Sequence, residues 1–249
     1  MGADEAIAEA PIDRLAAAAS VVPPSPPPRA APPVIVTEAP AGTLSARQLA
    51  AAAKDLGELA AAVHAFDGCA LKRTATNTVV ADGRPGARLM VIGEAPGAEE
   101  DRRGEPFVGR AGHLLDAMLH AIGLNRGTNV YIANVLKSRP PGNRDPKPEE
   151  VAACLPYLMR QIALLQPRLM LAVGRIAAQN LLSTDMPLGR LRGKVHHFGE
   201  LNTPLIVTYH PAYLLRTPAD KRKAWEDLKF ARNVFRQLTD RVGTDGNLC

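Results

Sequence analysis

Three side chains that could take part in acid–base chemistry or ligand recognition follow short apolar runs of the chain. Glu94 lies in the turn Gly93–Gly97, Asn134 closes the second run and His210 follows the fourth. They supply a carboxylate, a carboxamide and an imidazole. In open α/β sheets, ligands bind outside the carboxyl ends of the strands. If the runs are parallel strands, the spacing predicts one cleft that holds all three side chains.

The elements that must position these side chains are four buried strands and the helices between them. The apolar runs are continuous rather than alternating, which is typical of strands covered on both faces. They are Ala87–Ile92, Val130–Val135, Leu169–Val173 and Leu205–Tyr209. Helical patterns occupy Leu44–Phe66, Gly112–Ile122, Pro148–Leu165, Gly174–Leu182 and Ala219–Leu238. The alternation predicts an α/β fold, a three-layer α/β/α sandwich around a central four-stranded parallel sheet.

Proline marks the expected domain boundary. Nine of the 22 prolines fall between Pro11 and Pro40, where they remove backbone donors and favour a polyproline-type linker. We therefore expect a disordered Ala/Pro-rich tail and linker over 1–43, a folded domain over 44–240 and a flexible C-terminal tail over 241–249. A partner-binding arm is the alternative for the first segment, and its partner is unknown.

Composition and charge narrow the class of protein. No run of about 18 apolar residues occurs, so no membrane-spanning helix is expected. Three cysteines in 249 residues exclude a disulfide scaffold and favour a reducing, cytoplasmic setting. Residues 1–45 carry a net charge of −3 and the whole chain +5, which leaves +8 for the remainder. A basic domain favours a polyanionic partner.

Four separated motifs resemble those of the family 4 uracil-DNA glycosylases. They are Gly93–Asp101 (GEAPGAEED), Pro106–Gly112 (PFVGRAG), Asn134–Arg144 (NVLKSRPPGNR) and His210–Arg216 (HPAYLLR). The resemblance covers roughly residues 44–238. It implies a monomeric, monofunctional hydrolase that flips deoxyuridine out of single- or double-stranded DNA. Cleavage of the N-glycosidic bond releases free uracil and leaves an abasic site, which is the first step of base-excision repair.

The resemblance also implies roles for three residues that contact the base. His210 matches the histidine that donates a hydrogen bond to uracil O2, for which a neutral ring is best suited. Asn134 matches the asparagine that reads the Watson–Crick edge with one donor and one acceptor. Phe107 matches the aromatic residue that stacks on the flipped base. We expect His210 and Asn134 to act in catalysis as well as in binding.

Two carboxylates and one alanine complete the expected base pocket. Glu100 matches a position that crowds base C5 and so excludes the thymine methyl group. Glu94, the third expected catalytic residue, lies on the turn beneath the base. Ala95 stands where better-known relatives carry an aspartate that positions water, so either Glu94 or the backbone is left to hold the water.

A second group of residues is expected to grip and open the DNA. Leu214 resembles the leucine wedge that fills the space left by a flipped base. The candidate phosphate contacts are basic side chains near the cleft. They are Arg139, Arg144, Lys147, Lys194 and Arg216.

The chain departs from the family at its cofactor. Family 4 members carry a 4Fe-4S cluster on four cysteines. Cys69 and Cys154 match two of these positions, whereas Phe66 and Ser138 replace the other two ligands. A phenyl ring cannot coordinate iron, and a neutral hydroxyl is a poor substitute for a thiolate. We therefore expect no metal and no cofactor requirement for the chemistry.

Two other functions remain open at the level of sequence. One is a lesion-binding homologue that kept the pocket but has little or no turnover. The other is a glycosylase that acts on other deaminated bases.

Overall fold

A computed structural model describes residues 41–245 of the chain, with side chains from residue 45 to residue 240. The tail expected over 1–43 lies outside the described residues except at its last three positions, and residues 246–249 also lie outside them. The described residues belong to a single unit of the fold.

A six-stranded sheet forms the middle layer, in the order β1-β3-β2-β4-β6-β5. The strands are β1 (Ala81–Gly83), β2 (Leu89–Gly93), β3 (Val130–Asn134), β4 (Leu169–Val173), β5 (His196–Phe198) and β6 (Thr203–Thr208). The four central strands β3, β2, β4 and β6 are parallel. This confirms the α/β class and the four predicted strands.

The sheet has six strands rather than the four predicted, because an antiparallel strand is added at each edge of the central parallel four. β1 pairs with β3 and β5 pairs with β6. Each edge strand has only three residues, Ala-Asp-Gly and His-His-Phe, and none of the six is fully buried. Short, polar edge strands avoid templating further pairing, and they give no apolar run for a sequence pattern to detect.

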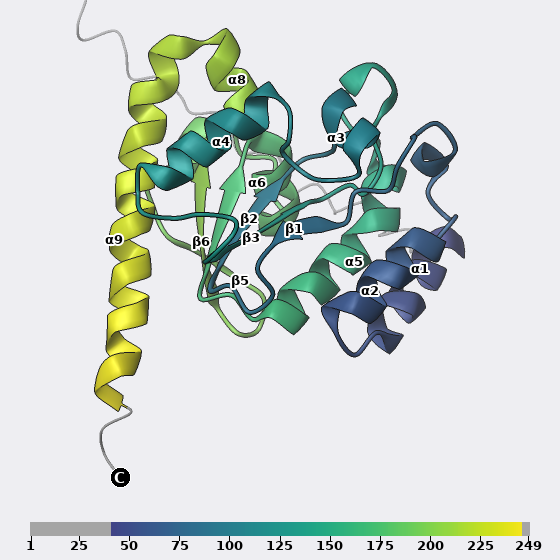
Figure 1. Ribbon diagram of the computed structural model, residues 1–249, viewed down its shortest axis with the longest axis horizontal. Helices are drawn as coiled ribbons and strands as arrows, with labels where there is room; N and C mark the ends of the chain where they lie inside the picture. The colour runs from purple at the N-terminus through teal and green to yellow at the C-terminus, as the bar shows by residue number, and fades with distance from the viewer. Residues whose placement is uncertain (1–40, 246–249) are drawn as a thin grey trace, which may run out of the picture. The chain divides into compact units, whose positions relative to one another are not determined.

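Helices cover both faces of the sheet (Figure 1), and the strand side chains alternate between two cores. Met90 and Ile92 of β2 face one core, while Leu89 and Val91 face the other. The first core is covered by α1 (Ala41–Ala52), α2 (Leu56–Ala65), α5 (Pro148–Leu165), α6 (Arg175–Leu182) and α7 (Leu188–Leu191). The second is covered by α4 (Arg110–His120), α8 (Pro211–Arg216) and α9 (Lys221–Asp245). The three-layer sandwich is therefore confirmed.

The helix expected over Leu44–Phe66 is two helices. Asp55 caps the start of α2, and its side chain accepts a hydrogen bond from the Glu58 backbone N–H at 2.8 Å. Glu58 in turn accepts from the Lys54 N–H at 2.7 Å. This reciprocal pair satisfies N–H groups that an interrupted helix leaves unpaired, so the chain begins a new helix there.

The remaining elements are short, apart from the last helix. They are α3 (Ala98–Arg103) and the 3-10 turns η1 (Ala70–Arg73), η2 (Pro141–Asn143) and η3 (Pro218–Asp220). α9 continues to Asp245, beyond the expected helix end at Leu238 and the expected domain end at residue 240. Within residues 41–245, no helix combines the length and the apolar character that a membrane crossing needs.

Candidate active site

A pocket of about 330 Å³ lies at the carboxyl ends of the parallel strands. β2 ends at Gly93 and β3 at Asn134, and His210 follows β6 after one intervening residue. The pocket brings together most of the residues expected from the sequence. Those that line it are Glu94, Ala95, Glu100, Phe107, Asn134, Arg144, His210 and Arg216.

Asn134, Phe107 and His210 converge on one small space. A Cβ atom placed on Gly93 would lie 2.4 Å from Asn134 Oδ1 and 2.5 Å from Phe107 Cζ, so glycine is what lets these two groups close over the end of β2. The ring centroids of Phe107 and His210 are 5.6 Å apart, with the planes inclined by 34°. The three groups are therefore close enough to contact a common planar ligand.

Asn134 is the most constrained of the three. Its side chain is 1% exposed, and Oδ1 has no hydrogen-bond partner among the described residues. The buried Lys137 ammonium donates to the Asn134 backbone carbonyl at 2.8 Å and to Gln161 Oε1 at 2.6 Å. Burial lowers the pKa of Lys137 to about 7. Sequence reasoning missed Lys137, although it lies within the third motif.

His210 is held as a neutral hydrogen-bond donor. It caps the start of α8, and its Nδ1 accepts from the Ala212 backbone N–H at 3.1 Å. Because Nδ1 is an acceptor, the single proton of the neutral ring lies on Nε2. Burial lowers the pKa of His210 to about 4, and the Arg216 charge acts in the same direction. At neutral pH the ring is therefore an uncharged Nε2–H donor on the wall of the pocket.

Glu94 titrates near neutral pH. Burial and, to a smaller extent, the neighbouring Asp145 carboxylate raise its pKa to about 7, against the opposing charge of Arg175. Arg175 is ion-paired with Asp145 at 2.6 Å. A carboxyl group with such a pKa in a cleft is suited to hold or activate water at neutral pH. Ala95, which also lines the pocket, has no group that could share this task.

Glu100 fixes the loop that carries Phe107. Its Oε1 accepts from the Val108 and Gly109 backbone N–H groups, both at 2.9 Å, and its Oε2 accepts from the Gly97 N–H at 3.1 Å. The side chain still lines the pocket. Its carboxylate therefore shapes the pocket wall while bonding to the protein backbone.

The predicted phosphate contacts divide into two groups. Arg216 is exposed and lines the pocket, and Arg144 lines it while forming a two-point ion pair with Glu150, at 2.6 and 2.9 Å. The structure does not place the other three in the pocket lining. Arg139 donates to Asn143 Oδ1 at 2.8 Å, and Lys147 and Lys194 are exposed.

The expectation that Leu214 is the DNA wedge was wrong, because this side chain is 1% exposed and packs in the core against α4 and the sheet. The next residue, Leu215, is 37% exposed. Adjacent residues on a helix point about 100° apart. Spacing from His210 could not tell which leucine of α8 faces the solvent.

The region matched to the family's cluster is closed. Cys69 and Cys154 are both buried, with their sulfur atoms 3.9 Å apart. The Phe66 ring packs on Tyr157, with centroids 5.2 Å apart, and the space left between these side chains is about 10 Å³. Ser138 is 3% exposed beside them. Two thiols in a space the size of a single water molecule do not fit a four-thiolate cluster.

Comparisons with known proteins agree with this geometry. The Uracil DNA glycosylase superfamily matches residues 80–229, a stretch that contains every residue assigned above to the pocket. The chain therefore belongs to the uracil DNA glycosylase superfamily.

Within that superfamily, the chain is similar to several proteins named type-4 uracil-DNA glycosylase. It is 43% identical to the one from Pyrobaculum aerophilum over 70% of this chain and 91% of the relative. It is 45% identical to the one from Archaeoglobus fulgidus over 65% and 83%, respectively. The Thermotoga maritima protein is 39% identical over 68% and 88%.

Proposed function

We infer that the protein is a uracil-DNA glycosylase that hydrolyses the N-glycosidic bond of deoxyuridine in DNA and releases free uracil. This is the activity that the type-4 relatives carry in their names. The observation that carries the proposal is the unpaired Asn134 Oδ1 beside the His210 Nε2–H donor and the Phe107 ring. Glycosidic bond cleavage opens base-excision repair, in which this enzyme takes the first step.

Asn134 supports selection of uracil by hydrogen-bond pattern. Its Oδ1 accepts the uracil N3–H, and its Nδ2 donates to uracil O4. Cytosine presents the reverse pattern, with an acceptor at N3 and a donor at N4. Each buried group left unpaired costs about 1–3 kcal/mol, so cytosine is rejected without steric exclusion. Contact of Glu100 with base C5 then excludes the thymine methyl group.

His210 and Phe107 support departure of the base as an anion. As the glycosidic bond breaks, negative charge grows on the base and the sugar becomes oxocarbenium-like. The neutral His210 Nε2–H donates to O2, where part of that charge collects. Loss of one such donor typically costs about 10²–10³-fold in rate. Stacking on Phe107 offsets the few kcal/mol that base flipping costs.

Glu94 is the residue that we assign to the attacking water. An oxocarbenium-like centre needs little nucleophile activation, so a carboxylate that orients water and faces the developing positive charge is sufficient. The neighbouring alanine offers no competing group. The water oxygen bonds to the sugar C1′ as the glycosidic bond breaks. Its proton passes to Glu94 or to solvent, and uracil leaves as an anion without being protonated.

The DNA substrate is single- or double-stranded and is bound by a monomer that acts in the cytoplasm or nucleoid. The basic domain attracts the phosphates, with Arg216 at the pocket rim and Arg139, Arg144, Lys147 and Lys194 as further contacts. Leu215 replaces Leu214 as the proposed wedge, because it is the exposed leucine of α8. The catalytic steps use no metal, and we propose that the chain carries no iron–sulfur cluster.

We expect the purified protein to release free uracil from a uracil-containing oligonucleotide in the presence of EDTA, without cutting the strand. Asn134→Ala is expected to lower kcat/KM for uracil release by about 10–100-fold, because the edge contacts are lost. Asn180→Ala is the matched control, since Asn180 on α6 bonds to the Ile176 carbonyl away from the pocket. Tight binding of uracil-containing DNA with zero turnover in the unaltered protein contradicts the proposal.

We expect kcat/KM to depend on the ionisation of Glu94. The free-enzyme pKa is raised to about 7 by burial, so the carboxylate fraction, and with it kcat/KM, rises about tenfold per pH unit below that value and levels off above it. Glu94→Gln should lower activity and flatten this limb. A pH profile from 5 to 9 on single-stranded substrate measures both. A limb that persists in Glu94→Gln assigns the titration to another group.

We expect Leu215→Ala to lower uracil release from duplex DNA at least several-fold more than from single-stranded DNA, because a wedge matters only where a stack must be kept open. Leu214→Ala should instead lower the free energy of unfolding by about 2–5 kcal/mol through a core cavity, without strand selectivity. Rates of uracil release from both substrates, together with denaturant unfolding curves, distinguish the effect of Leu215→Ala from that of Leu214→Ala. Equal losses on both substrates for Leu215→Ala rule out the wedge.

We expect anaerobically purified protein to contain far less than one iron per chain and to lack the visible absorbance of a cluster. The double variant Phe66→Cys, Ser138→Cys restores the four-cysteine pattern and should gain both iron and absorbance on reconstitution. An iron assay and a visible absorbance spectrum of both proteins test these expectations. Stoichiometric iron in the unaltered protein contradicts the proposal, and an iron-free double variant shows that these two positions are not the cause.

A further inference from the structure

We propose that Arg126 is a positioning residue for uracil excision, which fixes the Phe107 ring in the pocket by holding two consecutive backbone carbonyls. The inference rests on the proposed function, because it gives Phe107 the base-stacking role assigned above. Arg126 itself lies outside the pocket lining, and it contacts Phe107 through the backbone carbonyl rather than through the ring.

The Phe107 backbone needs such a support. Its φ is +54°, in the left-handed region that a bulky side chain rarely adopts. This conformation aims the ring over Gly93, where it meets Asn134 and His210. A relaxed backbone at this position would carry the ring elsewhere. The orientation of the stacking surface therefore depends on whatever keeps residue 107 in this conformation.

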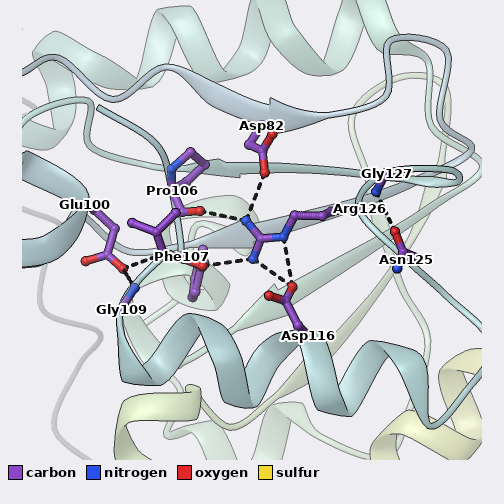
Figure 2. A network of polar contacts seen from close by, with 10 residues as sticks. Asp82, Glu100, Pro106, Phe107, Gly109, Asp116, Asn125, Arg126 and Gly127 are labelled. Carbon is purple, nitrogen blue, oxygen red and sulfur yellow. Dashed lines mark hydrogen bonds and ion pairs between the residues drawn. The ribbon is translucent and has the colours of Figure 1, made fainter. Parts of the chain in front are cut away.

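Arg126 supplies that restraint from the loop between α4 and β3 (Figure 2). Its Nη1 donates to the Pro106 carbonyl at 3.1 Å, and its Nη2 donates to the Phe107 carbonyl at 2.9 Å. A planar guanidinium grips two successive carbonyls with fixed geometry, which an ammonium cannot do. The next two backbone N–H groups, of Val108 and Gly109, are held by Glu100.

Two carboxylates hold the guanidinium in turn. Asp116 on α4 accepts from Nε at 2.8 Å and ion-pairs with Nη2 at 2.8 Å, and Asp82 on β1 accepts from Nη1 at 2.9 Å. Four of the five N–H groups of Arg126 thus donate a hydrogen bond to an oxygen, and Nη2 also lies in the ion pair with Asp116. Only 19% of the side chain is exposed. An edge strand and a helix therefore fix the loop that carries the stacking ring, as Figure 2 shows.

The Phe107 carbonyl also packs closely against Gly112. A Cβ atom at residue 112 would lie 1.8 Å from the Phe107 oxygen. The carbonyl is thus packed against the first turn of α4 and also bonded to Arg126. Both contacts act on the backbone of residue 107 rather than on its ring, which lines the pocket.

A double-mutant cycle on single-stranded uracil DNA tests the proposal, because coupling between Arg126 and Phe107 separates positioning from general stabilisation. We expect Phe107→Ala to lower kcat/KM by about 10–100-fold. Arg126→Gln should cause a loss of similar size, with weaker inhibition by free uracil. In the Phe107→Ala background, Arg126→Gln should cost less than about 3-fold. Arg126→Lys should fall between Arg126→Gln and the unaltered protein.

Arg168→Gln is the matched control. Arg168 is partly buried and also donates to a backbone carbonyl, that of Leu238, at 3.0 Å. It precedes β4, at the end of the sheet opposite the pocket. We expect this variant to lower the melting temperature without changing uracil inhibition and without coupling to Phe107. If Arg126→Gln does not fold, Asp82→Asn and Asp116→Asn loosen the guanidinium instead and should show graded losses that Phe107→Ala abolishes.

The outcomes distinguish the positioning role of Arg126 from the proposed glycosylase activity. Full activity in Arg126→Gln, or an equal loss with and without Phe107, overturns the positioning role and leaves the proposed function intact. Full activity in Phe107→Ala removes the stacking role and the inference together, while uracil release continues. Absence of uracil release by the unaltered protein overturns the proposed function itself.

Discussion

A buried carboxamide oxygen that has no hydrogen-bond partner within the described part of the chain is the constraint around which the pocket is arranged. A buried acceptor that stays unpaired costs about 1–3 kcal/mol, and Asn134 Oδ1 is such an acceptor in the lining of the pocket. The side chain cannot turn away to solvent, because it is buried at the end of β3 and its backbone carbonyl is held by Lys137. A ligand that brings a hydrogen-bond donor into the pocket pairs this acceptor, which supports the role proposed for Asn134 in binding the base.

The groups around Asn134 also adopt unfavourable arrangements that shape the pocket. Gly93 gives up a side chain so that the carboxamide and the Phe107 ring can meet, and Phe107 adopts a left-handed backbone that costs of order 1–3 kcal/mol. His210 is kept neutral by burial, with its proton directed by the first turn of α8. Each feature lowers the stability of the free protein. Hydrogen bonds hold each of these residues in place. Lys137 holds Asn134, Arg126 and Glu100 hold the Phe107 loop, and the Ala212 backbone holds His210.

The parts of this arrangement that follow from strong local patterns could be predicted from the sequence. The central strands are continuous apolar runs, and their ends place Glu94, Asn134 and His210 at one edge. The edge strands were missed because three residues, with no apolar run among them, are too few to carry a periodic signal. Leu214 was misassigned because spacing along the chain does not fix which side of a short helix faces the core. Arg126 was missed because its acceptors are backbone carbonyls and carboxylates of α4 and β1, whose proximity arises only after the edge strand pairs.

The region matched to the family's cluster is linked to the pocket by packing. Lys137 lines the small space between Cys69 and Cys154, and it also holds the Asn134 carbonyl, so the two sites share one side chain. The Phe66–Tyr157 contact and the burial of both cysteines join the segments that meet here by packing. Because a close-packed apolar cluster resists small displacements, the packing around Lys137 holds its side chain where it donates to the Asn134 carbonyl.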